Sequence, residues 1–276
     1  MRSKDKREQM VKKLAVIGKD VSKSTSPQMH GFIAKKLNLE VSYEKISIPE
    51  AEFETRIESL LNGYDGLNVT IPYKLSVIPH LKKTEGDAKV FGAVNTVNCK
   101  SLYGYNTDGL GFALMLKNNG VEVNGKTALL LGAGGAGRSV AKKLLDGGAK
   151  VFVYDRTAES ALNLEKEFNG VTALSQIENT AYDIIINATG VGMHKTEGLS
   201  PVGEELLKLC GVAVDLIYCP AKSKFLQIAE GLGKKIINGK AMLFYQAYYA
   251  DCIFFGLTPD EAQAKQLFNE FSKEEI

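Results

Sequence analysis

Residues 127–156 read TALLLGAGGAGRSVAKKLLDGGAKVFVYDR. An apolar run over 127–131 leads into a glycine-rich turn, and a helical segment with Val140 and Leu144 on one face comes next. A second apolar run then ends at Asp155. This order predicts a strand, a turn, a helix and a strand, which is the unit that binds the pyrophosphate of a dinucleotide.

The glycines of the turn have separate expected roles. Gly132 allows the tight turn away from the strand, Gly134 leaves room for the pyrophosphate, and Gly137 lets the helix pack closely on the sheet. Unpaired backbone N–H groups at the start of the helix then face the anion. Because an acidic residue also follows at the expected distance, we favour a dinucleotide site over a turn that binds nothing. The candidate phosphate cradle consists of Gly132, Ala133, Gly134, Gly135, Ala136 and Gly137.

The bulk properties are those of an ordinary globular protein. With 276 residues, the chain has room for one large or two medium domains. The net charge of +2 is close to balance and no basic block alternates with aromatic residues, so we expect no nucleic-acid partner. The four cysteines form no C-x-x-C pair, which argues against a disulfide framework or a metal site and suits a reducing cytoplasm.

The sequence also lacks the usual membrane and export signals. No uninterrupted apolar run of about 18 residues is present, so we expect no membrane span. Residues 1–13 are charged and lack the apolar centre of a signal peptide, and we expect them to form a tail. These features together predict a cytoplasmic protein.

The segment before the glycine turn alternates strand and helix patterns, which indicates an α/β layer structure. Helices are expected to begin at Pro27 and Pro49, because proline fits the first helical position. Ser26 is well placed to cap the first of them. Pro72 ends the third strand, and Lys74 then heads a short helical piece. The expected strands here are 14–18, 41–48 and 66–71.

The alternation continues beyond the glycine turn, so the chain as a whole is of the α/β class. Ligands of open parallel sheets bind beyond the carboxyl ends of the strands, which places Thr189, Gly190 and Tyr218 near the cofactor. Thr258 is expected to cap the last helix, with Pro259 at its first position. The further expected elements are a helix over 158–168 and strands over 183–190, 212–218 and 235–237.

Taken singly, the polar residues of the chain have plain structural explanations. Ser24 reads as a solvated loop hydroxyl, Lys74 as a surface lysine, and the Asn-Thr-Asp-Gly at 106–109 as a turn. The histidines show no pattern for a metal site or a catalytic triad, and we expect structural or surface roles for them. They are His30, His80 and His194.

Eight motifs in a fixed order are far more specific than any one of them. Together they span roughly residues 15–255 and resemble the shikimate dehydrogenase (shikimate/quinate dehydrogenase) family. The motifs are STSP at 24–27, NVTIPYK at 68–74, GAVNT at 92–96, NTDG at 106–109, the glycine turn, NAT at 187–189, DLIYCP at 215–220 and MLFYQA at 242–247.

The resemblance implies an α/β fold of two domains. An N-terminal α/β substrate domain, residues 1–108, would be completed by C-terminal helices within residues 239–276. A Rossmann-type dinucleotide-binding domain, residues 109–238, would be inserted between these two parts of the chain.

The resemblance also implies an activity, the reversible NADPH-dependent reduction of 3-dehydroshikimate to shikimate in aromatic amino-acid (chorismate) biosynthesis. Ser24 and Ser26 would bind the substrate carboxylate with help from Tyr218. Lys74 and Asp108 would flank the oxygen that changes between C=O and C–OH, as catalytic and substrate-binding residues. The residues implied to orient the ring are Thr70, Asn95 and Gln246. Beyond the glycine turn, the implied cofactor-binding residues are Asp155, Arg156, Thr157, Thr189, Gly190, Leu216 and Gly239.

Several positions depart from the family pattern. NADP users of the family often have Asn-Arg-Thr where this chain has Asp155 followed by arginine and threonine. An acid there favours the free ribose hydroxyl of NAD, whereas the arginine favours the 2′-phosphate of NADP. Because Arg156 and Thr157 both fit the NADP pattern, we expect NADP as the cofactor, with NAD as the alternative. Smaller departures are Lys23 for histidine, Ser223 for threonine and Ala241 for glycine.

Three alternative functions stay open at this point. The nearest is a quinate/shikimate dehydrogenase that uses NAD, for which Asp155 is the best support. A methylenetetrahydrofolate dehydrogenase would carry a different lysine motif, Tyr-x-x-x-Lys. A non-catalytic sensor of shikimate-pathway ligands would be expected to lack the Lys74 and Asp108 pair or the glycine turn, and both are present. We expect a small-molecule substrate and a monomer or homodimer.

Overall fold

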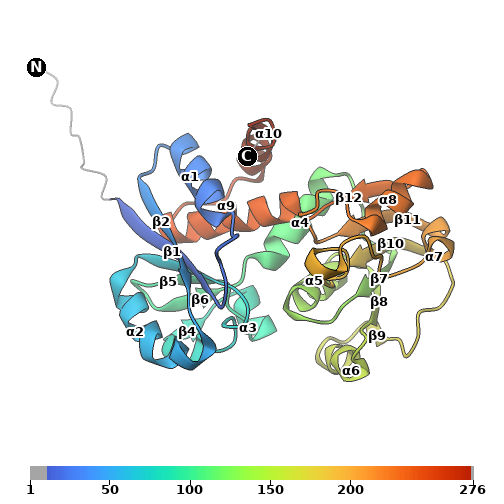
Figure 1. Ribbon diagram of the computed structural model, residues 1–276, viewed down its shortest axis with the longest axis horizontal. Coiled ribbons are helices and arrows are strands. Elements are labelled where there is room, and N and C mark those ends of the chain that lie inside the picture. The colour runs from blue at the N-terminus through green and yellow to red at the C-terminus, as the bar shows by residue number, and fades with distance from the viewer. Residues whose placement is uncertain (1–10, 275–276) are drawn as a thin grey trace, which may run out of the picture. The chain divides into compact units, whose positions relative to one another are not determined.

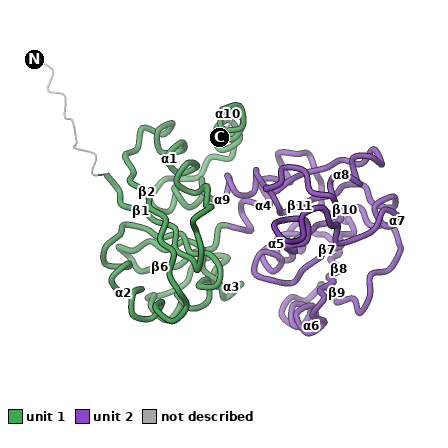
Figure 2. Tube along the Cα trace, in the orientation of Figure 1, with its two compact units in different colours: residues 1–107, 246–276 green, residues 108–245 purple. Residues whose placement is uncertain are grey.

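The computed structural model describes residues 11–274 and divides into two compact units (Figures 1 and 2). Unit 1 consists of the chain up to Thr107 and from Gln246 onward, and unit 2 runs from Asp108 to Tyr245. Helix α4 (Asp108–Asn118) opens unit 2, and helix α9 (Lys240–Phe255) continues from unit 2 into unit 1.

Unit 1 is built on a six-stranded mixed sheet with the order β2-β1-β3-β5-β6-β4 (Figure 1). The first three strands in this order are parallel, and β5 and β6 run antiparallel to their neighbours β3 and β5. Its elements are β1 (Lys12–Gly18), α1 (Ser26–Lys36), β2 (Val41–Ser47), η1 (Glu50–Glu52), α2 (Phe53–Gly63), β3 (Gly66–Val69), η2 (Ile78–His80), β4 (Lys83–Thr84), α3 (Asp87–Phe91), β5 (Thr96–Asn98), β6 (Tyr103–Tyr105), part of α9, and α10 (Glu261–Phe271).

Alternate residues of β1 supply the two sides of the unit 1 core, as the two-residue period of a strand requires. Ala15 and Ile17 pack with Phe53 and Ile57 on the apolar face of α2. Leu14 packs instead with Ala250 and Phe254 of α9. Burying each large apolar side chain contributes roughly 1.5–3 kcal/mol, so both faces of this strand hold the sheet to its helices.

Unit 2 is built on a six-stranded sheet with the order β12-β11-β10-β7-β8-β9, in which all neighbouring strands are parallel. The strand order reverses between β7 and β10, and ligands of such sheets bind outside the carboxyl ends of the strands at that point. Its elements after α4 are β7 (Thr127–Leu131), α5 (Gly135–Asp146), β8 (Lys150–Tyr154), α6 (Ala158–Glu167), β9 (Val171–Ala173), β10 (Tyr182–Asn187), η3 (His194–Thr196), α7 (Glu204–Lys208), β11 (Cys210–Asp215), α8 (Lys224–Gly231) and β12 (Lys235–Ile237).

Two predicted helix caps were wrong. Helix α1 already includes Ser26, and Thr25 stands at the cap position without a capping side-chain bond. Helix α10 begins at Glu261, and the Asp260 carboxylate accepts hydrogen bonds from two backbone N–H groups of its first turn, so Thr258 is not the cap. An ionised carboxylate is a strong cap at the positive end of a helix, and this explains the later start.

Other local predictions also needed correction. Residues 71–77 form turns, so Lys74 does not head a helix. The predicted tail reaches too far, because β1 already begins at Lys12; residues 1–10 of that tail lie outside the described residues. Within residues 11–274, no helix is both long and apolar enough to cross a membrane.

Candidate functional site

The backbone at Lys74 is held from two sides. Tyr73 stacks on Phe53, with 4.3 Å between the ring centroids, and its hydroxyl donates to the Ile48 carbonyl at 2.5 Å. The Val94 N–H donates to the Lys74 carbonyl at 2.8 Å. A half-buried lysine on a fixed backbone is suited to deliver a proton to one defined place.

Thr70 and Ser24 lie on loops that follow strands of the unit 1 sheet, and Ser26 is the first residue of α1. The Thr70 N–H continues the pairing of β3 by donating to the Ile17 carbonyl at 2.9 Å. The Ser24 hydroxyl donates to the Ser26 hydroxyl at 3.0 Å, and the Ser26 N–H donates back to the Ser24 hydroxyl at 3.2 Å. Both hydroxyls therefore sit together at the start of α1, where the helix dipole favours an anion.

Asn95 and Gln246 are brought together although 151 positions separate them in the chain. The Asn95 side-chain amide donates to Gln246 Oε1 at 3.2 Å and to the Thr107 hydroxyl at 3.1 Å. Its oxygen accepts from the Thr107 N–H at 2.9 Å. These bonds engage both hydrogens and the oxygen of the Asn95 side-chain amide and fix its orientation in the buried interior.

Asp108 is buried and is the first residue of α4. The two residues before it are anchored to the segment that contains Asn95, because the Asn106 amide donates to the Ala93 carbonyl at 3.0 Å and Thr107 bonds Asn95. These bonds fix the backbone from which the Asp108 carboxyl group extends.

The glycine turn of unit 2 has the geometry of a phosphate cradle. Gly132 has φ +102°, a conformation that side chains rarely adopt. A Cβ atom at Gly137 would lie 2.1 Å from the Gly132 carbonyl oxygen, so α5 passes too close to the turn for any side chain. Gly134 and Gly135 are exposed and a Cβ on either would meet nothing, which leaves open space at the start of α5.

Both oxygens of Asp155 are engaged by backbone N–H groups. Oδ2 accepts from Ala133 in the glycine turn, and Oδ1 accepts from Thr157, each at 2.8 Å. The side chain thus ties the end of β8 to the turn and to the start of α6. Arg156 and Thr157 themselves are exposed.

A buried polar cluster shapes the loops after β10 and β11. The Asn187 oxygen accepts from the N–H and the hydroxyl of Thr189, and its amide donates to Asp215 Oδ1 at 3.0 Å. Asp215 also accepts from Ile217 N–H at 3.0 Å and from the Ser223 hydroxyl at 2.5 Å. The cluster therefore fixes the backbone that presents the predicted cofactor residues after both strands.

The backbone at Gly239 lies against the backbone of Leu216 and Ile217. The Gly239 N–H donates to the Ile217 carbonyl at 3.0 Å, and a Cβ at Gly239 would lie 2.0 Å from the Leu216 carbonyl oxygen. Glycine is therefore required at position 239. Tyr218 lies in the loop after β11, two residues beyond Leu216, and 38% of its surface is exposed.

Comparison with known proteins decides the family. A shikimate dehydrogenase (NADP(+)) from Carboxydothermus hydrogenoformans is 40% identical over 256 residues, which cover 88% of this chain and 91% of that protein. The chain belongs to the shikimate dehydrogenase family. Residues 16–97 match the model of the shikimate dehydrogenase substrate binding domain, and residues 114–195 match that of shikimate / quinate 5-dehydrogenase.

Relatives from Thermus thermophilus agree with this assignment. A shikimate dehydrogenase (NADP(+)) of that organism is 39% identical over 250 residues, covering 90% of this chain and 94% of the relative. A crystal structure of shikimate 5-dehydrogenase from the same organism, in complex with NADP(H) and shikimate, matches with a TM-score of 0.85 and 37% identity over 95% of this chain and 99% of that one. The predicted family and α/β fold class are thus confirmed.

Several residues that shape the site in this chain are not singled out by the sequence patterns. Tyr43 and Asn68 bond each other at 2.7 Å beside the predicted substrate residues. His30, for which a structural or surface role was expected, is buried and pairs with Asp251 at 2.6 Å. Asn187 and Asp215 lie within two of the family motifs, which assign them no role. A usable signal existed for the last two, because each is a polar residue that ends a run of buried apolar strand residues.

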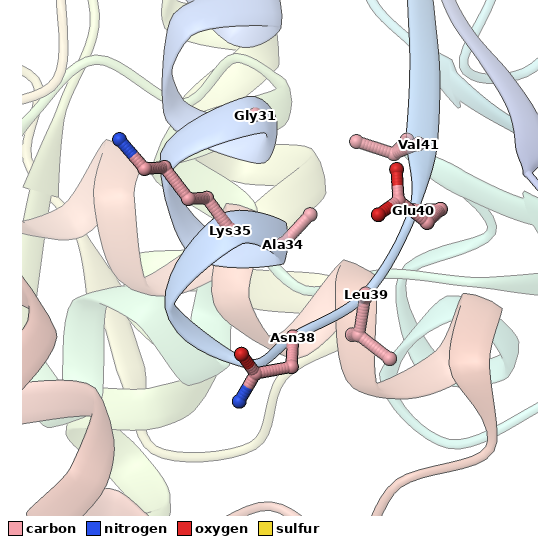
Figure 3. Close-up of a pocket in the computed structure, with 7 residues that line it drawn as sticks. All are labelled: Gly31, Ala34, Lys35, Asn38, Leu39, Glu40 and Val41. Carbon is pink, nitrogen blue, oxygen red and sulfur yellow. The ribbon is translucent and has the colours of Figure 1, made fainter. Parts of the chain in front are cut away.

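A separate surface hollow lies between the last turns of α1 and the residues that lead into β2, with Lys35, Asn38 and Glu40 in its lining (Figure 3). It contains none of the predicted site residues, and we assign it no ligand. No cluster of metal-ligating side chains occurs in the part of the chain that the structure describes.

The buried Asp215 carboxyl predicts a pH dependence of stability. Burial raises its pKa from the ordinary 3.8 to about 6, against the opposing hydrogen bonds from Ser223, Ile217 and Asn187. Between about pH 4 and 6 the folded protein therefore keeps a proton that the unfolded chain has lost, so this group's contribution to stability falls as pH rises through that window. The change is on the order of 3 kcal/mol.

We expect the free energy of unfolding of the wild type to fall relative to that of Asp215→Asn as pH rises from about 4 to 6, and to stay level relative to it above about pH 7. Urea unfolding of both proteins across this range measures the difference, from which other titrating groups cancel. A difference that does not vary with pH would show that Asp215 is ionised in the folded protein throughout.

Proposed function

We propose that this protein is a shikimate dehydrogenase that reversibly reduces 3-dehydroshikimate to shikimate with NADPH, in aromatic amino-acid (chorismate) biosynthesis. The similarity over nearly the whole chain to shikimate dehydrogenases (NADP(+)) carries the proposal. The local geometry around the predicted residues is compatible with this chemistry.

The substrate is a small ring with one carboxylate and several hydroxyl groups, and we assign it to residues 1–108 together with 239–276. The paired hydroxyls of Ser24 and Ser26 donate to the carboxylate, assisted by Tyr218. The ring hydroxyls are oriented by hydrogen bonds, so the site rejects analogues that leave these buried polar groups unpaired. The ring-orienting residues in this proposal are Thr70, Asn95 and Gln246.

Reduction of the ketone needs a hydride at carbon and a proton at oxygen. The bound cofactor supplies the hydride, so the chain has to move only the proton. Protonated Lys74 donates to the forming alkoxide, and neutral Lys74 accepts the proton in the reverse direction. Asp108 accepts hydrogen bonds from the lysine and from a substrate hydroxyl, which orients both.

The cofactor is assigned to residues 109–238 and Gly239, with the glycine turn at the pyrophosphate. Asp155 is the residue that would favour NAD, but both of its carboxylate oxygens already accept backbone N–H groups. The exposed guanidinium of Arg156 is suited to the 2′-phosphate of NADP. The other residues assigned to the cofactor are Thr157, Thr189, Gly190 and Leu216.

The test follows NAD(P)H absorbance at 340 nm with shikimate or quinate, each paired with NADP or NAD. We expect turnover of shikimate with NADP, at a kcat/KM at least about tenfold above that with NAD, which corresponds to about 1.4 kcal/mol of discrimination. Turnover of both acids with NAD would move the assignment to a quinate/shikimate dehydrogenase. If shikimate binds but no pair of acid and cofactor is turned over, the catalytic assignment fails and a non-catalytic sensor of shikimate-pathway ligands is the remaining hypothesis.

We also propose a cytoplasmic location and a monomer or homodimer without a nucleic-acid partner. The nearly balanced net charge of +2 supports the last point, since nucleic-acid binding depends on a basic surface. Size-exclusion chromatography with light scattering gives the oligomeric state directly.

A further inference from the structure

Helix α1, which begins at Ser26 of the proposed carboxylate site, is joined to helix α9 by two buried side chains that have no role in the reaction so far. His30 Nδ1 of α1 lies 2.6 Å from Asp251 Oδ1 of α9, and the two side chains are 2% and 1% exposed. Ser26 lies one helical turn before His30, so both residues face the same side of α1. Gln246 lies on α9 as well. The pair therefore connects the helix of a proposed carboxylate-binding serine with the helix of a proposed ring-orienting amide.

The α9 side of this pair is fixed on the sheet of unit 1. A Cβ atom at Gly66 of β3 would lie 2.4 Å from Cδ1 of Phe254, so α9 passes close to that strand. The side-chain amide of Asn98 in β5 donates to the Ile253 carbonyl at 3.4 Å. Asp251 thus stands on a helix whose position is set by two strands of the sheet.

The ring of His30 is held in place on its other sides. It stacks on Tyr43 of β2, with 4.4 Å between the centroids and 15° between the planes, and its centroid lies 6.3 Å from that of Phe254. A ring in a fixed plane has its Nδ1 pointing in a fixed direction. Because a hydrogen bond weakens steeply away from its preferred angle, the bond to Asp251 is satisfied over only a narrow range of rotations of α1 about its axis.

The pair is poorly suited to a role in stability alone. Oδ2 of Asp251 is buried, and none of the described residues donates a hydrogen bond to it. Burial raises the pKa of this carboxyl, and the neighbouring His30 opposes the rise only in part. Apolar side chains of similar size often stabilise a protein as much as a buried polar pair or more, but their contacts have no preferred direction. What the pair adds to apolar packing is therefore a defined rotation of α1.

A small rotation of α1 matters at its first residue. At roughly 5 Å from the helix axis, a turn of about 10° moves a side-chain oxygen by about 1 Å. A displacement of that size is enough to impair a site that depends on precise positions. The hydroxyl of Ser26 is therefore sensitive to any loosening of α1.

We propose that His30 and Asp251 are positioning residues that hold the hydroxyl of Ser26 in a fixed place relative to Gln246. The inference rests on the proposed function, because it takes a rigid ring acid as the ligand. Such a ligand presents its carboxylate and its hydroxyls at a constant span, and a site already set to that span loses less entropy on binding it. Neither His30 nor Asp251 contacts the substrate in this role.

The first test is an apolar-pair variant, His30→Phe combined with Asp251→Leu, which keeps a ring against Tyr43 and removes the directional bond. We expect its free energy of unfolding to equal or exceed that of the wild type. We expect KM for shikimate to rise about tenfold, with kcat within about threefold and KM for NADP unchanged, because Ser26 is assigned to the carboxylate and not to the reacting oxygen. Urea unfolding and steady-state rates measure these quantities.

A conservative variant and a second pair on the same helix are the controls. Asp251→Asn keeps an oxygen that accepts a hydrogen bond from His30 Nδ1, and we expect its KM for shikimate to stay within about twofold of the wild type. Lys36 and Glu270 join the opposite end of α1 to α10 at 2.5 Å. Lys36→Met with Glu270→Gln is expected to change KM by less than about twofold, because that partly exposed pair lies roughly 15 Å from Ser26 along the helix.

The second test asks whether the pair acts through Ser26. Ser26→Ala is made in the wild type and in the apolar-pair variant. In the wild type we expect KM for shikimate to rise about tenfold, as the loss of a hydrogen bond to a charged group implies. In the apolar-pair variant the serine is already displaced, so we expect the same substitution to raise KM by less than about threefold.

The outcomes distinguish the two proposals. An unchanged KM for shikimate in the apolar-pair variant, whatever its stability, overturns the positioning role and leaves the proposed function standing. The positioning role is also overturned if Ser26→Ala raises KM equally in both backgrounds. Should the apolar-pair variant fail to fold, Asp251→Ser, whose shorter side chain does not reach His30, replaces it in both tests. If the wild type does not turn over shikimate, the calorimetric Kd for shikimate replaces KM, and absence of binding to the wild type overturns both proposals.

Discussion

Replacement of Lys74 by methionine is expected to lower kcat for shikimate oxidation by about 10²–10⁴-fold, the usual contribution of a positioned proton donor or acceptor. Methionine keeps most of the length of the side chain and removes only the group that moves the proton. The backbone bond from Val94 and the packing of Tyr73 do not involve the amine, so the loop that carries residue 74 is expected to keep its shape. Steady-state rates with NADP at saturating shikimate give kcat.

A matched lysine in the same unit controls for the loss of a charge. The exposed Lys83 pairs with the partly buried Glu85 at 2.5 Å and has no role in the proposed reaction, so Lys83→Met is expected to change kcat by less than about twofold. Calorimetry with shikimate shows whether Lys74→Met still binds. The role of Lys74 in proton transfer is refuted if that variant keeps more than about a tenth of the wild-type kcat.

The α/β class and the dinucleotide-binding unit could be predicted because each depends on sequence patterns within short segments. The glycine turn between two apolar runs predicted the strand, turn and helix that the structure shows at β7 and α5, and the alternation around it predicted the α/β class. Short elements were not predicted. A three-residue strand such as β9 or a five-residue helix such as α7 is too short to show the repeat of apolar residues by which a strand or helix is recognised.

Local patterns also mislead where two residues compete for one role. Thr258 and Asp260 are both good caps, and only the geometry of the chain entering α10 selects the carboxylate. Asp155 shows the same limit at the cofactor site. Its charge in the sequence argues for NAD, whereas the structure commits both oxygens to the backbone of the turn and the next helix.

Contacts between distant residues explain the rest of what the sequence did not reveal. Tyr43 and Asn68 are 25 positions apart, and His30 and Asp251 are 221 apart. No motif or periodicity joins such residues, since they meet only because separate strands and helices assemble into one sheet and its covering layer. The predicted serines and amides were found through family motifs, whereas the contact between Tyr43 and Asn68 needed the fold.

Replacement of Gly137 by alanine is expected to damage unit 2 itself. The added Cβ would lie 2.1 Å from the Gly132 carbonyl oxygen, a backbone atom that cannot turn aside as a flexible side chain would. To remove this clash, α5 has to move away from the turn after β7. That movement disturbs the packing of α5 on the core of unit 2. We expect a loss of about 3 kcal/mol or more in the free energy of unfolding, together with loss of measurable NADPH binding. Urea unfolding and NADPH fluorescence titration measure the two effects.

Gly134→Ala separates the cofactor role of the turn from its structural role. At φ −72° and ψ −170° the backbone accepts alanine, and the added methyl meets nothing within 4 Å, so stability is expected to stay within about 0.5 kcal/mol of the wild type. The methyl would nevertheless occupy the space through which the pyrophosphate approaches the backbone, and we expect NADPH to bind about 10–100-fold more weakly. Gly231→Ala, at an equally open glycine that ends α8, should change neither quantity. Wild-type NADPH affinity in Gly134→Ala would mean that the pyrophosphate does not lie over this residue, and the assignment of the cradle would then be wrong.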